Sequence, residues 1–133
     1  MSKAISHKRV ERYLRECLVW MGLGHWNYHL STFDGAELPD TPPFRTACVS
    51  IVSEASALFK VSTGREWDEV KRSVIHECCH LQVRELREHF NTIKDSVGCD
   101  TWAILDNGWN TIEERTVLRM ERAMMGALLH ENE

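Results

Sequence analysis

The stretch SVIHECCHLQV, residues 73–83, sets two histidines and a glutamate into an apolar segment with a helical pattern. In this stretch and just before it, apolar residues recur at spacings of three and four, as they do on one face of a helix. They are Trp67, Val70, Val74, Cys78 and Leu81. Just before this stripe, Thr63 and Glu66 have the spacing of a capping box, in which each side chain bonds the other residue's backbone N–H. The sequence therefore predicts a long helix over residues 65–90.

The remaining periodicities predict two further helices and a small sheet. A helix is expected over residues 5–21, closed by Gly22 and Gly24, and a last helix over residues 110–130. Alternating or β-branched residues predict strands at 25–33, 46–52 and 57–62. Gly98 and Gly108 favour a broken connection between the last two helices. The predicted fold class is α+β, with an N-terminal helix, about three strands and two later helices, in one domain covering residues 1–133.

Composition excludes several classes of partner. The chain has 20 acidic and 16 Lys or Arg residues and a net charge of −4, which argues against nucleic acid as its main partner. Its first residues lack the apolar core of a signal peptide, and no run approaches the roughly 20 apolar residues of a membrane span. The five cysteines are odd in number and lack framework spacing, so we expect thiols in the cytoplasm.

The histidines of the central segment have the spacing of paired metal ligands. On a helix, His76 and His80 lie one turn apart and about 40° apart around the axis, so both rings can reach one ion. Glu77 lies about 100° away, where it can reach a water molecule bound to that ion. This H-E-x-x-H spacing is typical of zinc peptidases, in which the carboxylate takes a proton from the metal-bound water. We therefore predict Zn²⁺ as cofactor and Glu77 as general base.

Two thiols in the same segment are an alternative pair of ligands. Cys78 and Cys79 could bind zinc as thiolates, which are strong ligands for this ion. On the helical wheel, however, Cys78 falls roughly opposite His76, and Cys79 lies about 60° from it, where it would compete for space. We therefore expect both cysteines to fill the core.

A catalytic zinc ion needs a third protein ligand, and the last predicted helix supplies carboxylates. Glu113 and Glu114 flank its apolar face about equally. Glu121 falls near the centre of that face, where it could hydrogen-bond a ligand histidine. Thr111 and Glu114 are also three apart and could simply form a capping box. Helical geometry alone leaves these alternatives open.

The order of elements, the SVIHECCHL segment and the later EERTVLRMERAM segment together resemble the small zincin-like metallopeptidases of phages and their bacterial relatives. These are minimal gluzincin-like enzymes with an H-E-x-x-H helix and a downstream glutamate ligand. The ERTVLRM segment is similar to the family's glutamate pattern at Glu114, Val117 and Arg119, which implies that Glu114 is the third ligand. Leu118 stands where the family often has an acidic residue. The resemblance implies a peptide or protein substrate and, for a phage-encoded chain, the host cytoplasm.

Two further questions stay open at this level. Arg84, Arg87, Tyr28 or His29 could stabilise an oxyanion, although ion pairing of the arginines, for example with Glu88, and packing of Tyr28 are simpler readings. The alternative function is a non-catalytic binding or structural module, stabilised by zinc, such as a virion or regulatory component. Four protein ligands would favour that module, whereas three ligands and a water would favour an enzyme.

Overall fold

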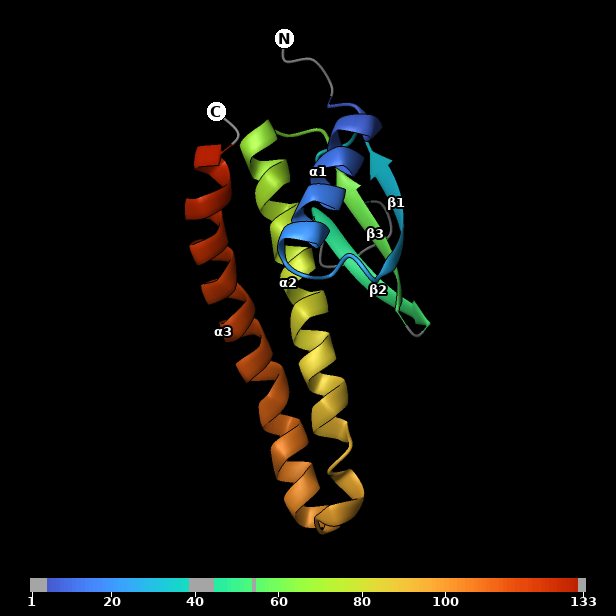
Figure 1. Ribbon diagram of the computed structural model, residues 1–133, viewed down its shortest axis with the longest axis vertical. Helices are drawn as coiled ribbons and strands as arrows, with labels where there is room; N and C mark the ends of the chain where they lie inside the picture. The colour runs from blue at the N-terminus through green and yellow to red at the C-terminus, as the bar shows by residue number, and fades with distance from the viewer. Residues whose placement is uncertain (1–4, 39–44, 54, 132–133) are drawn as a thin grey trace. The chain divides into compact units, whose positions relative to one another are not determined.

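The structure is a computed structural model that describes residues 5–38, 45–53 and 55–131 (Figure 1). Three long helices and a three-stranded sheet confirm the α+β class. The elements are α1 (His7–Trp20), β1 (Asn27–Phe33), β2 (Ala47–Ser53), β3 (Ser56–Ser62), α2 (Trp67–Asn91), the 3-10 turn η1 (Lys94–Ser96) and α3 (Cys99–Glu131). Each strand lies within two residues of its predicted position.

The chain divides into two compact units, Met1–Cys78 and Cys79–Glu133, and the boundary falls inside the continuous helix α2. A single domain over residues 1–133 stays a prediction. None of the helices in the described part of the chain combines the length and the apolar character that a membrane span requires.

In the first unit, β3 is the central strand of the sheet. It pairs in parallel with β1 and antiparallel with β2, so that Phe59 lies opposite both Leu30 and Val49. Phe59 and Val61 of β3 are fully buried, because alternate residues of a strand point to the same face. The flanking strands are more exposed and form the two edges of the sheet.

Helix α1 covers His7–Trp20, two residues later at its start and one residue earlier at its end than the predicted 5–21. The Ser6 hydroxyl accepts a hydrogen bond from the Arg9 backbone N–H (3.2 Å), and Gly22 has a φ of +75°, a conformation that glycine adopts without strain. One face of the helix is buried, comprising Val10, Tyr13, Leu14, Cys17 and Leu18. Tyr13 packs edge-on against Trp67 at the start of α2, with ring centroids 5.5 Å apart.

The predicted capping box before α2 is wrong. The helix begins at Trp67 rather than near residue 65, and Thr63 is occupied elsewhere. Both the backbone N–H (2.6 Å) and the hydroxyl (3.0 Å) of Thr63 donate to the carbonyl of Phe33 at the end of β1. Thr63 therefore extends the pairing between β1 and β3, and it lies four residues before the first helical residue, Trp67, rather than at the N-cap.

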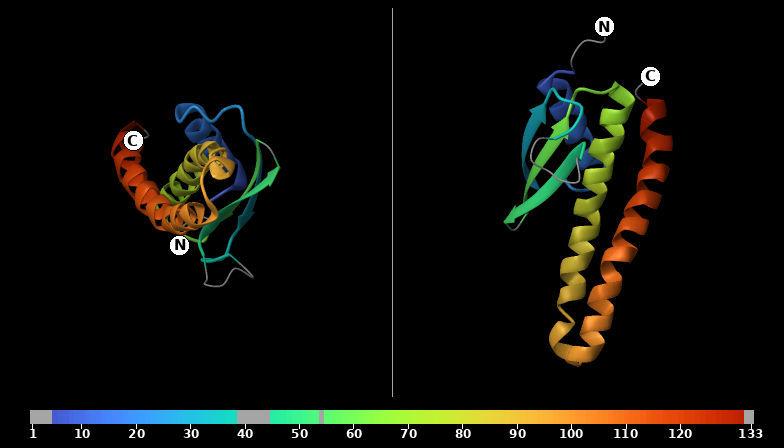
Figure 2. Two further views of the ribbon diagram at one scale, coloured as in Figure 1. Left: turned by 90° about the horizontal axis from the view of Figure 1, so that it is seen from below. Right: turned by 180° about the vertical axis from the view of Figure 1, so that it is seen from behind.

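The predicted break between the last two helices is confirmed up to Gly98, because α2 ends at Asn91 and α3 begins at Cys99, but it is wrong at Gly108, through which α3 continues. Within the second unit, the later part of α2 turns through η1 into α3, and Figure 2 shows this turn from two further sides. Phe90 of α2 stacks on Trp102 (5.2 Å between centroids) and on Trp109 (5.1 Å) of α3. Glycine inside a helix costs only about 1 kcal/mol relative to alanine, which such aromatic contacts can offset.

Candidate metal centre

The H-E-x-x-H segment lies in the middle of α2, as predicted. His76 and His80 are both half-buried, and the helix is unbroken between them, so they lie one turn apart on the same side. Glu77 is buried, with 8% of its surface exposed. Cys78 and Cys79 are completely buried, which confirms their predicted place in the core.

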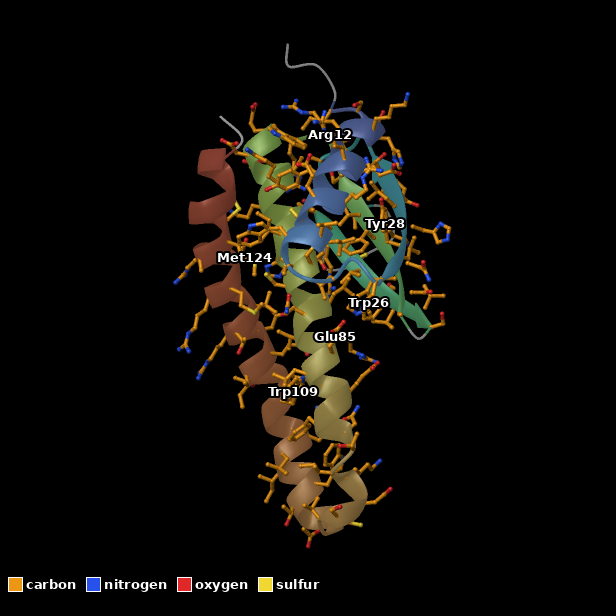
Figure 3. All side chains as sticks on the ribbon, viewed as in Figure 1. Arg12, Trp26, Tyr28, Glu85, Trp109 and Met124 are labelled. Carbon is orange, nitrogen blue, oxygen red and sulfur yellow. The ribbon has the colours of Figure 1, made fainter. Side chains whose placement is uncertain are left out.

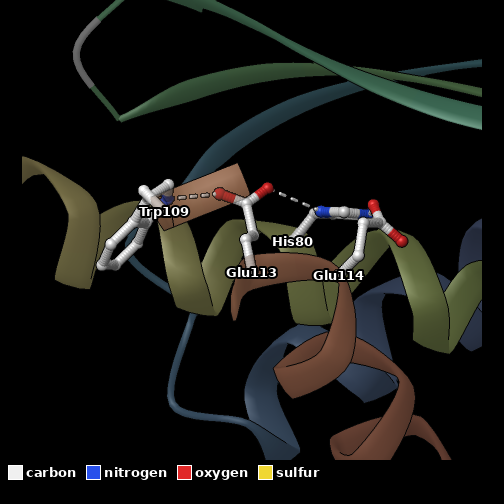
Figure 4. Close-up of polar contacts among 4 residues, drawn as sticks. All are labelled: His80, Trp109, Glu113 and Glu114. Atoms are coloured by element: carbon white, nitrogen blue, oxygen red, sulfur yellow. Dashed lines mark hydrogen bonds and ion pairs between the residues drawn. The ribbon is translucent and has the colours of Figure 1, made fainter. Parts of the chain in front are cut away.

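Two neighbouring glutamates of α3 contact the same imidazole of α2 (Figure 4). Glu113 Oε2 lies 3.2 Å from Nδ1 of His80, and Glu114 Oε1 lies 3.2 Å from Nε2 of the same ring. An ionised carboxylate only accepts hydrogen bonds, so Nδ1 donates its proton to Glu113. Each ring nitrogen of His80 therefore faces a different carboxylate.

The three predicted ligands come together. One ligand atom from each of His76, His80 and Glu114 lies within 4.8 Å of the other two. Bonds of about 2.0–2.1 Å in a tetrahedral zinc site place neighbouring ligand atoms about 3.3 Å apart. The 3.2 Å between His80 Nε2 and Glu114 Oε1 already matches that spacing. The donor set, two imidazoles and one carboxylate, is one that zinc accepts, so these residues fit the ion.

The role of Glu113 differs from those considered in the sequence. Its second oxygen, Oε1, accepts a hydrogen bond of 2.8 Å from the indole Nε1 of Trp109, one turn earlier on α3. Glu113 therefore bridges two donors and supports the His80 ring. Leu118 is 43% exposed, and Glu113 provides the carboxylate that contacts Nδ1 of His80. The i, i+4 spacing of Trp109 and Glu113 was the available sequence signal.

Two alternatives for the carboxylates of α3 have different outcomes. Thr111 and Glu114 both lie in the interior of α3, far from its first residue, Cys99, so they do not form a capping box. Glu121 is buried on the same helix, and its predicted hydrogen bond to a ligand histidine stays a prediction.

The carboxylate of Glu77 affects the ionisation of a thiol in the first unit. Burial raises the pKa of Cys48 on β2, and the nearby carboxylate of Glu77 raises it further. Because that effect depends on proximity, the Glu77 carboxylate is close enough to Cys48 to disfavour its thiolate.

The remaining candidates have simpler roles. Arg84 Nε lies 3.6 Å from Glu88 Oε1, one turn along α2, and Arg87 forms an ion pair with Asp106 of α3. On β1, Tyr28 is half-buried and His29 is exposed (Figure 3). Their proposed part in oxyanion stabilisation stays a prediction.

The buried cysteines make packing contacts within the core. Cys79 Sγ lies 3.7 Å from Sδ of Met124, which α3 directs toward α2 (Figure 3). Soft sulfur groups adapt to irregular gaps between helices, so this contact needs no functional explanation. Each of the five cysteines is present as a thiol.

Comparison of the chain with protein-family models, with curated proteins and with solved structures gives no match. In the candidate site, α2 supplies His76, Glu77 and His80, and α3 supplies Glu113 and Glu114.

Proposed function

We propose that this chain is a zinc-dependent metallopeptidase of the small zincin-like kind, in which His76, His80 and Glu114 hold the ion. The observation that carries the proposal is the convergence of these three ligand atoms within 4.8 Å. Glu113 supports it, because a carboxylate on Nδ1 of His80 leaves Nε2 available to a metal. The proposed substrate is a peptide or protein. The five thiols support a reducing compartment such as the cytoplasm.

A zinc ion held by His76, His80 and Glu114 would polarise the scissile carbonyl and would lower the pKa of a bound water molecule toward neutrality. Glu77 accepts a proton from that water as the water oxygen attacks the carbonyl carbon. Glu77 then passes the proton to the amide nitrogen, and the C–N bond breaks to release an amine and a carboxylate. Burial of Glu77 suits this role, since a carboxylate removed from bulk water interacts more strongly with nearby charge.

The first experiment is metal analysis of protein purified without added metal. Wild-type protein is expected to carry one zinc ion per chain, and His76→Ala and Glu114→Ala are expected to lose it. Glu88→Ala is the matched control, because Glu88 is exposed and belongs to a surface ion pair on α2. Equal metal content in all four proteins would contradict the proposed ligands.

The second experiment separates metal binding from catalysis. Glu77→Gln is expected to keep its zinc and to lose about 10²–10⁴-fold in peptide cleavage, the usual contribution of a general base. A peptide library provides the substrates. Loss of zinc from Glu77→Gln, or unchanged cleavage, would rule out the role of Glu77.

A structural role for the ion is the second candidate. Glu113 and Glu114 of α3 both contact His80 of α2, so an ion at this point would tie the two helices of the second unit together. X-ray absorption on the zinc protein distinguishes the two functions. Three protein ligands and a water oxygen indicate the enzyme, and four protein ligands indicate the structural module.

A further inference from the structure

We infer that Trp109 is a positioning residue of the metal centre, which fixes the Glu113 carboxylate and through it the ring of His80. The inference deepens the proposed function and rests on it for the metal. The orientation of His80 that it describes can also be measured without metal. Trp109 acts through Glu113, whose Oε1 accepts its indole N–H.

The geometry is a chain of two hydrogen bonds through one carboxylate (Figure 4). Trp109 Nε1 donates to Oε1 of Glu113 over 2.8 Å, and His80 Nδ1 donates to Oε2 over 3.2 Å. An indole N–H can only donate and an ionised carboxylate can only accept, so the direction of both bonds is determined. With Oε1 held by the indole, Oε2 is presented to the imidazole in one orientation.

With an ion bound, this arrangement assigns the two ring nitrogens of His80. Nδ1 donates to Glu113, and Nε2, which lies 3.2 Å from Glu114 Oε1, is the nitrogen that the ion would use. In known metal sites, such carboxylate partners fix the tautomer and the ring orientation, and losing them costs about 10–100-fold in metal affinity or activity.

The indole ring is itself held from α2. It stacks on Phe90 with centroids 5.1 Å apart and planes inclined by 22°, and Arg87 Cζ lies 5.3 Å from its centroid. Arg87 is in turn paired with Asp106 on α3. Trp109 is thus anchored on one side by ring contacts and aimed at Glu113 by its N–H.

Trp102 offers a matched control. It stacks on the same Phe90 at 5.2 Å and 27°, and Arg87 Cζ lies 5.7 Å from its centroid. The ring contacts of the two tryptophans are thus alike, whereas only Trp109 bonds Glu113. Replacing each by phenylalanine removes an indole N–H and keeps an aromatic ring, so the two variants lose similar packing.

The experiment measures zinc affinity by competition with a chromophoric chelator and records the ¹H–¹⁵N signal of the His80 Nδ1–H by NMR on metal-free protein. Trp109→Phe is expected to bind zinc about tenfold more weakly, at the lower end of the effect of outer-shell partners. Its Nδ1–H signal is expected to broaden through faster exchange with solvent, because Glu113 is no longer held by the indole. Trp102→Phe is expected to keep the affinity within about twofold and the Nδ1–H signal unchanged.

A double-mutant cycle shows whether Trp109 acts through Glu113. In the Glu113→Ala background, Trp109→Phe is expected to cause no further loss of affinity, because the bridging carboxylate is already gone. An equal loss in both backgrounds, or equal losses from Trp109→Phe and Trp102→Phe, would overturn the inference in favour of aromatic packing.

The test of zinc binding and the test of the positioning role of Trp109 give separate results. A wild-type protein that binds no zinc contradicts the proposed function, and the NMR comparison in metal-free protein then decides the inference. A His80 Nδ1–H signal that changes in Trp109→Phe but not in Trp102→Phe supports the positioning role. The same signal in both variants refutes it.

Discussion

The two units of the chain use different means of stabilisation. Of the 22 apolar or cysteine side chains that are buried among the described residues, seventeen lie in Met1–Cys78. Of the nine large apolar side chains exposed in the same part of the chain, six lie in Cys79–Glu133. Apolar burial is the main favourable term in folding, so the first unit has the conventional core.

The second unit relies instead on specific side-chain pairs. Phe90 stacks on two tryptophans, Arg87 pairs with Asp106, and His80 lies between two glutamates. Such contacts contribute less per residue than buried apolar area. The proposed ion at His80 would therefore contribute more to the stability of the second unit than to that of the first.

Removing the centre of the first core has the largest expected effect. Phe59→Ala deletes a fully buried ring on the central strand and is expected to lower the free energy of unfolding by about 3–5 kcal/mol. Urea denaturation followed by circular dichroism measures the change. The control is Val52→Ala on the exposed edge strand β2, which should stay within about 0.5 kcal/mol of wild type.

Metal removal is expected to act mainly on the second unit. At a free zinc concentration about 100 times the dissociation constant, binding stabilises the folded state by about 2.7 kcal/mol. A chelator should therefore speed amide hydrogen exchange in α3 and leave β3 almost unchanged. His80→Ala protein should show no response to the chelator. Uniform acceleration of amide exchange across both units would contradict this difference between them.

Two glycine substitutions should have opposite signs. A Cβ on Gly64 would lie 2.5 Å from the carbonyl oxygen of Asp34 and 2.7 Å from the carbonyl carbon of Gly35, so the backbone would have to move. Gly64→Ala is expected to destabilise the protein by about 1–3 kcal/mol. A Cβ on Gly108 meets no atom within 4 Å, and Gly108→Ala should stabilise α3 by about 0.5–1 kcal/mol. Thermal unfolding of both variants gives the signs, and a stabilising Gly64→Ala would contradict the crowding.

The smallest expected effect concerns the thiol beside Glu77. The negative charge of Glu77 contributes to raising the pKa of Cys48, so Glu77→Gln should lower that pKa and increase the thiolate fraction at pH 8. Alkylation of Cys48, followed by peptide mass spectrometry, should become faster. Lys60 acts in the opposite direction on the same group, and Lys60→Gln should slow the alkylation. Unchanged labelling in Glu77→Gln would place its carboxylate away from β2.

Helices and strands that are determined by a local pattern of residues could be predicted from the sequence. The β-branched runs marked the strands, and the apolar stripes marked α1 and α2, because these patterns reflect which face of each element is buried. Two failures have non-local causes. Thr63 has the spacing of a cap but bonds Phe33, thirty residues earlier, and Gly108 suggests a break in a helix that Phe90 supports through stacked rings.

The residues of the candidate site likewise divide into those that the sequence could predict and those that it could not. His76, Glu77 and His80 follow from one helical turn, so their spacing alone predicted their arrangement. Glu113 and Glu114 are adjacent, differ by about 100° on the helix and flank its apolar face equally, so the wheel could not assign their roles. Only the position of α3 beside the His80 ring shows that each contacts a different nitrogen.

The strand order has a consequence for synthesis on the ribosome. β3 is made last and yet lies between its two partners, so β1 and β2 leave the exit tunnel with no neighbour to pair with. The nascent chain must keep both segments from aggregating until residues 56–62 emerge, and the helix carrying the histidines follows immediately afterwards. The sheet can therefore close only once β3 has emerged, and a pause in translation before that point would extend the interval in which β1 and β2 are unpaired.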